Sequence, residues 1–337
     1  MRFFRNSYGH QALKIRVKGF IERILRRYPL CSSLPVTTTS LREKQSIDRP
    51  IFIVGCGRSG TSMLFSLLSE HSSLLPTNGF PDGEDSLMWA QYGGAFVSGF
   101  GGTPSRTPVG FCHCLPMTDS DVDDNRSQFF TNFLINKYPQ IKNGQKRLLN
   151  KNPHLSNKIG YLLKLFPDAI IIHIIRDPYS VIASWKVILK ALKNVYVEIP
   201  EAEDACMNIY PGRITQSGFF KLNGVNKRIY NPLEEDSLCL LAEHWLNINT
   251  HIRRQSESNN NCNIHHLKYE NLFADQTVTM NRTLEFCDLP GKENWSVRVE
   301  GNPNQKWRSQ LNRNEISIIN QVLSGRIESL GYQLEDV

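Results

Sequence analysis

The chain has 337 residues, is 40% hydrophobic and carries a formal net charge of +7. Residues 1–30 contain eight Lys or Arg and one acidic residue, Glu22, and the other 307 residues are balanced in charge. A nucleic-acid enzyme usually spreads basic surface over its folded body, so this distribution disfavours a nucleic-acid partner. The length allows a full hydrophobic core and predicts one large domain with an arm.

The arm, residues 1–30, has apolar side chains at helical spacing and basic side chains on its other faces. This pattern predicts a basic amphipathic helix. It could make peripheral contact with an anionic membrane, where each basic residue contributes about 1 kcal/mol, or it could pack on the domain. No apolar run approaches the roughly 20 residues that cross a bilayer, and no secretory signal is evident, so we expect a cytoplasmic protein that is peripheral to the membrane if the arm binds lipid.

The next segment, residues 31–48, is rich in Ser, Thr and Pro and is predicted to be a linker. The domain then occupies residues 49–337. It begins with a short apolar run, "PIFIV", which predicts a strand, followed by a glycine loop and by "TSMLFSLLSE", which predicts a helix.

The same strand and helix alternation continues along the domain. A strand "AIIIHII" lies between two predicted helices within residues 161–190, and a strand over 263–269 follows a predicted helix at 235–255. Long apolar strands alternating with helices predict an α/β protein with a three-layer P-loop-like fold, in which helices flank a central parallel sheet. The stretches at about 91–125 and 192–234 lack periodicity and are predicted to be irregular lid or substrate segments.

The glycine loop "GCGRSGTS" matches a phosphate loop except that Thr61 stands where the template requires lysine. Its glycines allow backbone N–H groups and the following helix N-terminus to hold an anion, and Arg58 adds a permanently charged donor fork. Without the lysine, triphosphate chemistry is disfavoured. Arg176 closes an apolar strand, where open α/β sheets bind ligands, and Ser184 follows in the next helix. A plain turn at the loop and an Arg176–Asp177 surface ion pair are the alternatives without function.

Five segments together resemble the ordered motifs of sulfotransferases that use 3'-phosphoadenosine 5'-phosphosulfate (PAPS). They are "GCGRSGTSML", "LNKNP", "FPDAIIIHIIRDPYSVIASW", "LKYENL" and "QKW", and they run from residue 51 to about 308. The likeness is nearest to the tyrosylprotein sulfotransferase-like branch, which includes bacterial members. It covers neither the arm nor the two irregular segments.

The resemblance implies a role for each matching residue. Arg176 and Ser184 would bind the 3'-phosphate, Tyr269 would lie near the cofactor, and Lys306 would close over it. Lys151 would stabilise the transferring sulfuryl group together with Arg58. The 5'-phosphosulfate would be bound by Arg58, Ser59, Gly60, Thr61 and Ser62.

The reaction also needs a base for the acceptor hydroxyl. The resemblance points to a glutamate after the first helix, and "PDGEDS" offers Glu84, with Asp85 as its neighbour. His154 is a further rival, whereas His173 lies in mid-strand and is expected to be a core histidine. In the interpretation without function, the two acids cap a helix that starts at Ser86.

These observations predict an enzyme that moves a sulfuryl group from PAPS, as co-substrate, to a hydroxyl of a glycan, lipid, tyrosine or small alcohol. A nucleotide kinase and a non-catalytic nucleotide-binding protein are the alternatives. Eight cysteines without a repeated short spacing give no zinc pattern, so no metal site is expected.

Overall fold

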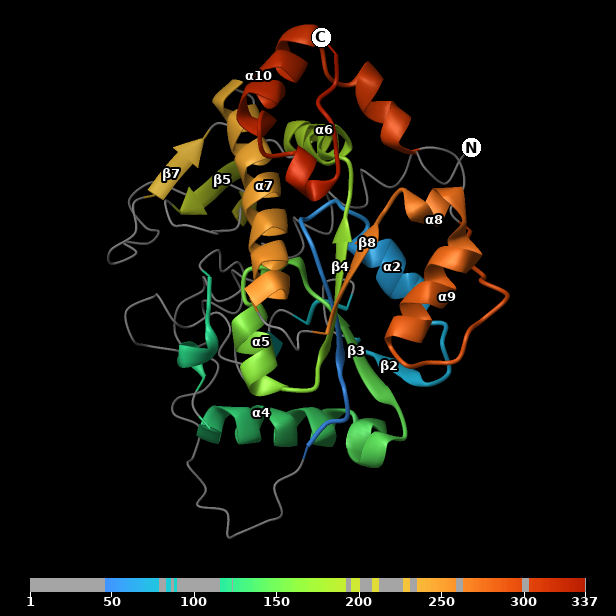
Figure 1. The fold of residues 1–337 in the computed structure, drawn as a ribbon. Helices are drawn as coiled ribbons and strands as arrows, with labels where there is room; N and C mark the ends of the chain where they lie inside the picture. Colours follow the sequence, from blue (N-terminus) through green and yellow to red (C-terminus); the bar gives the residue numbers. More distant parts are fainter. Residues whose placement is uncertain are drawn as a thin grey trace.

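The fold was obtained as a computed structural model, shown in Figure 1. It describes residues 46–78, 83–85, 88–89, 116–122, 124–191, 195–200, 208–211, 227–230, 235–258, 263–298 and 303–336. The predicted arm and most of the predicted linker lie outside these residues, as does most of the segment 91–125.

A parallel sheet of five strands forms the centre of the domain, in the order β2-β3-β1-β4-β8. The strands are β1 (Ile51–Val54), β2 (Leu74–Pro76), β3 (Arg147–Lys151), β4 (Ile170–Ile175) and β8 (Ile264–Lys268). In the register of the sheet, Ile53 lies opposite both Lys151 and Ile172. The carboxyl ends of β3, β1 and β4 therefore meet at one edge, where ligands bind in open parallel sheets.

Alternate residues of the central strand face two separate hydrophobic layers. Ile51 and Ile53 pack on the side of α2 (Thr61–Leu68), α8 (Asn271–Ala274) and α9 (Gln276–Phe286), whereas Phe52 and Val54 pack on the opposite side. That side is covered by α4 (Asp124–Lys137), α5 (Ile159–Leu165), α6 (Pro178–Ala191), α7 (Glu235–Ser258) and α10 (Arg313–Leu323). The predicted three-layer α/β fold is confirmed.

Short elements connect these layers. The 3₁₀ turns are η3 (Asp119–Asp121), η4 (Pro139–Gly144), η5 (Pro153–Leu155), η6 (Pro303–Ser309) and η7 (Glu328–Leu330). The strands predicted at 50–54, 169–175 and 263–269 correspond to β1, β4 and β8, but β2 and β3 were not predicted.

One expectation about the connecting segments was wrong. The segment 192–234 contains an antiparallel sheet in the order β6-β5-β7, made of β5 (Val195–Pro200), β6 (Asn208–Pro211) and β7 (Lys227–Tyr230). Its strands are short, and each pairs with a strand from another part of the segment. A prediction based on long apolar runs therefore does not detect them.

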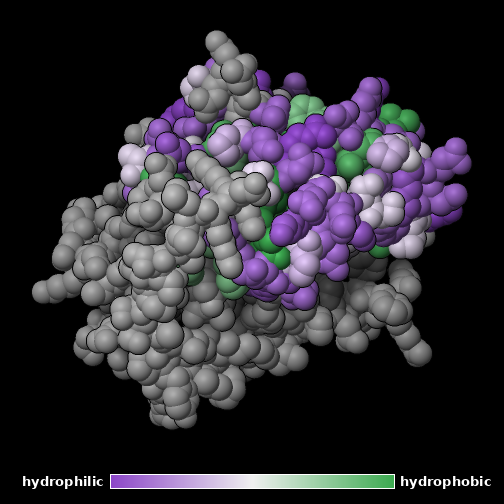
Figure 2. Space-filling view, turned by 90° about the horizontal axis from the view of Figure 1, so that it is seen from below, coloured by the Kyte–Doolittle hydropathy of each residue, from purple (hydrophilic) through white to green (hydrophobic). Residues whose placement is uncertain are grey.

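The described surface on the face seen in Figure 2 is mostly hydrophilic, with hydrophobic residues in small groups. The large apolar side chains that are exposed in the described residues are Phe129, Val278 and Phe286. Single exposed apolar residues are normal in folded proteins. Within the described ranges, no helix combines the length and hydropathy that a bilayer crossing requires.

A set of polar contacts crosses the layer between β4 and α7, from the buried Asn249 to the exposed His266. His173, which is 2% exposed, contacts Asn249 Oδ1 through Nε2 at 2.9 Å and His266 Nδ1 through Nδ1 at 2.9 Å. Because the Asn249 amide nitrogen donates to Trp245 O, the Asn249 oxygen accepts from His173, and His266 then donates to His173. His173 is thus the neutral core histidine expected from its mid-strand position.

The burial of His173 predicts that acid lowers the free energy of unfolding. Burial, followed by the charge on His266, lowers the pKa of His173 from 6.5 to about 3. Between these values the unfolded chain binds the proton more readily, so the free energy of unfolding is highest above pH 6.5 and falls as the pH drops. We expect protonation linked to His173 alone to lower the free energy of unfolding by about 2 kcal/mol between pH 8 and pH 5.

Urea denaturation at pH 8 and pH 5 measures this effect. The variant His173→Gln should be less stable than the wild type at pH 8 and should lose about 2 kcal/mol less on acidification. An equal loss in both proteins would show that His173 does not carry the dependence.

Candidate functional site

The loop between β1 and α2, residues 55–60, makes two close approaches that only glycine permits. Gly55 has a φ of 145°, and a Cβ there would lie 2.3 Å from the carbonyl oxygen of Ile174. Gly60 has a φ of 96°, and a Cβ there would lie 2.4 Å from ring atoms of Tyr269. The glycines therefore bring the loop backbone against the ends of β4 and β8.

Two side chains from neighbouring elements fix this loop. The Gly55 N–H donates to Ser156 Oγ at 2.8 Å, and Ser156 Oγ donates to the Gly55 carbonyl at 3.1 Å. From α6, Trp185 Nε1 donates to the Gly57 carbonyl at 3.2 Å. Three hydrogen bonds from two other segments of the chain thus hold the loop conformation.

The N-terminus of α2 opens at the end of the loop. Its first intrahelical hydrogen bond runs from the Leu64 N–H to the Gly60 carbonyl, so the N–H groups of residues 61–63 precede it. Ser62 is exposed there, whereas Thr61 is 5% exposed. A helix end with such N–H groups attracts anions.

Ser59 is placed differently from its neighbours in the loop. Its Oγ is buried without a hydrogen-bond partner in the described part of the chain, and its N–H donates to the Cys56 carbonyl at 3.1 Å. Among the residues predicted to bind the phosphosulfate, Ser59 therefore has a hydroxyl that is enclosed within the loop, whereas Ser62 is exposed.

Arg58 joins the loop to α6 and to the end of β4. Its Nε donates to Ser184 Oγ at 3.0 Å, and its carbonyl accepts from Arg176 Nη1 at 3.3 Å. The φ of Arg58 is 76°, an uncommon value for a residue with a side chain, and such conformations concentrate at functional sites. The structure therefore brings together Arg58, Arg176 and Ser184, which were predicted from separate motifs.

Tyr269 completes this group. The Arg176 guanidinium lies 4.5 Å from the centroid of the Tyr269 ring, a cation–π distance. Arg176 Nε also donates to Asn304 Oδ1 at 2.9 Å, so η6 is attached to the same cluster. The predicted Lys306 is exposed two residues further along η6.

A second group lies at the carboxyl end of β3. Lys151, which is 1% exposed, forms an ion pair with Glu84, with 3.0 Å between Nζ and Oε1. The Glu84 side chain is 15% exposed, so it is less enclosed than Lys151. The predicted base and the predicted cation, 67 residues apart in the chain, are thus in contact.

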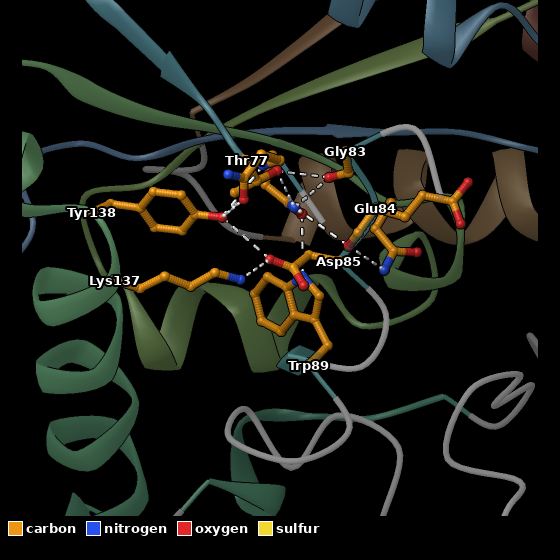
Figure 3. Close-up of polar contacts among 10 residues, drawn as sticks. Thr77, Gly83, Glu84, Asp85, Trp89, Lys137 and Tyr138 are labelled. Carbon is orange, nitrogen blue, oxygen red and sulfur yellow. Dashed lines mark hydrogen bonds and ion pairs between the residues drawn. The ribbon is translucent and has the colours of Figure 1, made fainter. Parts of the chain in front are cut away.

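An amide cluster holds the backbone around Glu84. Asn150 Nδ2 donates to the Gly83 carbonyl at 2.9 Å and to Thr77 Oγ1 at 2.9 Å, and its Oδ1 accepts from Trp89 Nε1. Asn152 Nδ2 donates to the Glu84 carbonyl at 3.2 Å. Figure 3 shows these contacts converging on the segment from Gly83 to Asp85.

The two acids of this segment face different surroundings. Asp85 is 5% exposed, lies 2.6 Å from Lys137 Nζ and accepts from the Tyr138 hydroxyl at 3.3 Å, both at the end of α4. Figure 3 shows its carboxylate directed to Lys137 and Tyr138, whereas the Glu84 side chain extends away from them. Asp85 thus forms a buried structural pair, so the two acids are not an exposed pair; Ser86, where a helix was considered to start, lies outside the described residues.

The remaining rival, His154, lies in η5. It is half-buried, its N–H donates to Asn152 Oδ1, and its carbonyl accepts from Lys158 Nζ. Among the described residues, no group of three or more His, Cys, Asp or Glu could hold a metal ion.

The comparison with protein families concerns the central part of the chain. A sequence model described as "Sulfotransferase family" matches residues 50–217, which include the glycine loop, Glu84, Lys151, Arg176 and Ser184. Residues 50–217 belong to the sulfotransferase family. The match is to the family as a whole and does not distinguish the tyrosylprotein branch.

Individual relatives of this chain are distant. An uncharacterised protein of Aquifex aeolicus is 23% identical over 252 residues, which are 74% of this chain and 26% of that protein. Nodulation protein NoeE of Sinorhizobium fredii is 29% identical over 142 residues, which are 40% of this chain and 30% of that protein. The matches thus span about a quarter to a third of these relatives' lengths. Among solved structures, the sulfotransferase domain of the Synechococcus PCC 7002 olefin synthase aligns with a TM-score of 0.48 and 16% identity, over 89% of this chain and 100% of that domain.

Proposed function

We propose that this sulfotransferase transfers the sulfuryl group of PAPS to a hydroxyl acceptor and releases 3'-phosphoadenosine 5'-phosphate (PAP). The observation that supports this most is the Lys151–Glu84 pair at the carboxyl edge of the sheet, beside the glycine loop. A protein that only bound a nucleotide would use the loop and the arginines but would need neither Lys151 nor Glu84.

The residues of the site fit the chemistry of PAPS. The N–H groups at the start of α2 and the Arg58 guanidinium suit its 5'-phosphosulfate. Arg176 and Ser184 suit its 3'-phosphate, and both contact Arg58, Arg176 through the Arg58 carbonyl and Ser184 through the Arg58 Nε. PAPS would supply an activated sulfuryl group, whose S–O bond to the phosphate breaks during transfer. A nucleoside triphosphate would instead call for a loop lysine, where this chain has Thr61.

Each side chain then has one task. Glu84 accepts the proton of the acceptor hydroxyl as that oxygen attacks sulfur. Lys151 and Arg58 stabilise the negative charge that grows on the oxygens around sulfur and on the leaving phosphate, and they do so best because the protein holds them in place beforehand. Ser184 and Arg176 hold the nucleotide.

The proposed chemistry requires only that the acceptor has a hydroxyl group. A glycan, a lipid, a tyrosine or a small alcohol would each present one to Glu84. A peripheral membrane contact through residues 1–30 stays a prediction, and liposome binding with and without those residues tests it.

Arg176→Ala is expected to weaken the binding of PAP by about 1.5–3 kcal/mol, because a charge-assisted hydrogen bond is lost. The binding of AMP, which lacks the 3'-phosphate, should change little. Isothermal titration measures both, and Arg253→Ala, an exposed arginine of α7, is the matched control. Equal weakening of both nucleotides would remove Arg176 from the 3'-phosphate site.

The experiment that tests the function as a whole is calorimetric titration with PAP, with and without magnesium, beside ATP and AMP. We expect binding that requires the 3'-phosphate and ignores magnesium, followed by sulfation of a hydroxyl compound in an acceptor screen with PAPS. Preference for ATP with magnesium would replace the proposal with a kinase-like function. Binding of PAP without any turnover of PAPS would favour a non-catalytic nucleotide-binding protein.

A further inference from the structure

We infer that Asn304 and Glu270 are positioning residues that orient Arg176 toward the 3'-phosphate, linked to the C-terminal segment through Tyr332. This inference rests on the proposed function, because it assumes that Arg176 binds that phosphate. Neither residue need touch the nucleotide.

The inference starts from the contact that fixes the Arg176 side chain. Arg176 Nε donates to Asn304 Oδ1 at 2.9 Å, and Asn304 Nδ2 donates to Glu270 Oε1 at 2.5 Å. Asn304 thus uses its acceptor for the arginine and a donor for the carboxylate, which determines which way its amide points. The geometry leaves the amide one orientation that serves both partners.

Glu270 acts on both sides of this link. Its Oε1 also accepts from the Asp177 N–H at 2.9 Å, so the same oxygen fixes the backbone that follows Arg176. The carbonyl of the same peptide group, that of Arg176, accepts from Trp245 Nε1 at 2.9 Å. The backbone and the side chain of Arg176 are therefore held by one connected set of hydrogen bonds.

Tyr332 ties the C-terminal segment to this set. Its hydroxyl donates to Glu270 Oε2 at 2.8 Å, while its ring lies edge-on to Trp245 and under the Lys268 ammonium, 4.7 Å from the ring centroid. Burial and then the charge of Glu270 raise the pKa of Tyr332, so its hydroxyl remains a donor. A path of three hydrogen bonds thus runs from Tyr332 to Glu270, to Asn304 and to Arg176.

This arrangement suits positioning because an arginine loses much side-chain freedom when it binds a phosphate. Holding Nε on Asn304 fixes the plane of the guanidinium before the ligand arrives, which lowers that entropic cost. AMP makes no contact that needs this plane. Disruption of the path should therefore affect only nucleotides that carry a 3'-phosphate.

The test compares dissociation constants for PAP and AMP in full-length variants by isothermal titration. Asn304→Ala is expected to raise the Kd for PAP about 5- to 10-fold and that for AMP less than about 2-fold. Gln305→Ala, an exposed neighbour in η6, is the matched control. Tyr332→Phe should raise the Kd for PAP by a smaller factor. Glu335→Gln changes the same C-terminal segment but removes the ion pair with Arg308 of η6, and it should leave the Kd for PAP unchanged.

The double variant Arg176→Ala/Asn304→Ala separates positioning from general stability. If Asn304 acts through Arg176, the double variant should bind PAP no more weakly than Arg176→Ala alone. Additive losses, or equal losses for PAP and AMP in Asn304→Ala, would overturn the inference. If Arg176→Ala itself shows no selectivity for PAP, the proposed site fails instead.

Discussion

Replacement of Lys151 by methionine is expected to lower the turnover of PAPS about 10²- to 10³-fold, the cost of one lost charge-stabilising donor in an acyl- or phosphoryl-transfer site. Lys151 Nζ lies 3.0 Å from Glu84 Oε1, and the proposed function assigns it to the charge that develops as the sulfur–oxygen bond breaks. Methionine keeps the length of the side chain in a position that is 1% exposed, so it removes the charge with little change of volume.

The variant should bind PAP with nearly the wild-type affinity, because Lys151 acts on the transferring group that PAP lacks. Release of PAP from PAPS, with and without an acceptor, measures turnover, and calorimetry measures binding. Lys292→Met is the matched control, since Lys292 also pairs with a glutamate, Glu70, at 2.8 Å but at the far end of α2. A loss of PAP affinity that equals the loss of turnover would place Lys151 in nucleotide binding instead.

The parts of the fold that the sequence predicted are those with a strong local signal. The strands β1 and β4 are continuous apolar runs buried on both faces, and the helices that follow them have regular apolar spacing. By contrast, β3 has the sequence RLLNK and is buried throughout. Its charged end residues do not fit the apolar pattern that predicts a buried strand. Its burial depends on partners that are distant in the chain, Arg49 and Cys287 for Arg147, and Glu84 for Lys151.

The candidate site divides in the same way. The loop, Arg176 and Lys151 lie in motifs with a family resemblance, so they could be named before the structure was known. Asn304 and Tyr332 have no such signal, because their role arises only when η6 and the C-terminal segment fold back on β8. Sequence alone favoured Glu84 as the base with Asp85 close behind it, and the position of α4 with Lys137 shows that their surroundings differ.

Glu84→Gln is expected to lower the acceptor-dependent turnover about 10²- to 10⁴-fold while the Kd for PAP stays within about 2-fold of the wild type. Glutamine has the same shape and can still accept the hydrogen bond from Lys151 through its amide oxygen. It cannot take a proton from a hydroxyl, so the variant removes the base and leaves the architecture around Asn150 and Asn152 in place. Steady-state kinetics with an acceptor from the screen and calorimetry with PAP provide the two measurements.

Asp85→Asn is the control that makes this result specific. Asp85 is paired with Lys137 and hydrogen-bonded to Tyr138, so its neutral variant should lower the melting temperature yet keep turnover per folded molecule within about 3-fold. Near-normal turnover in Glu84→Gln would contradict the assignment of the base, and His154, half-buried beside Asn152, would be tested next. Loss of turnover in both variants with intact folding would mean that proton transfer depends on the position of the whole segment from Gly83 to Asp85, which Asn150 holds through the Gly83 carbonyl.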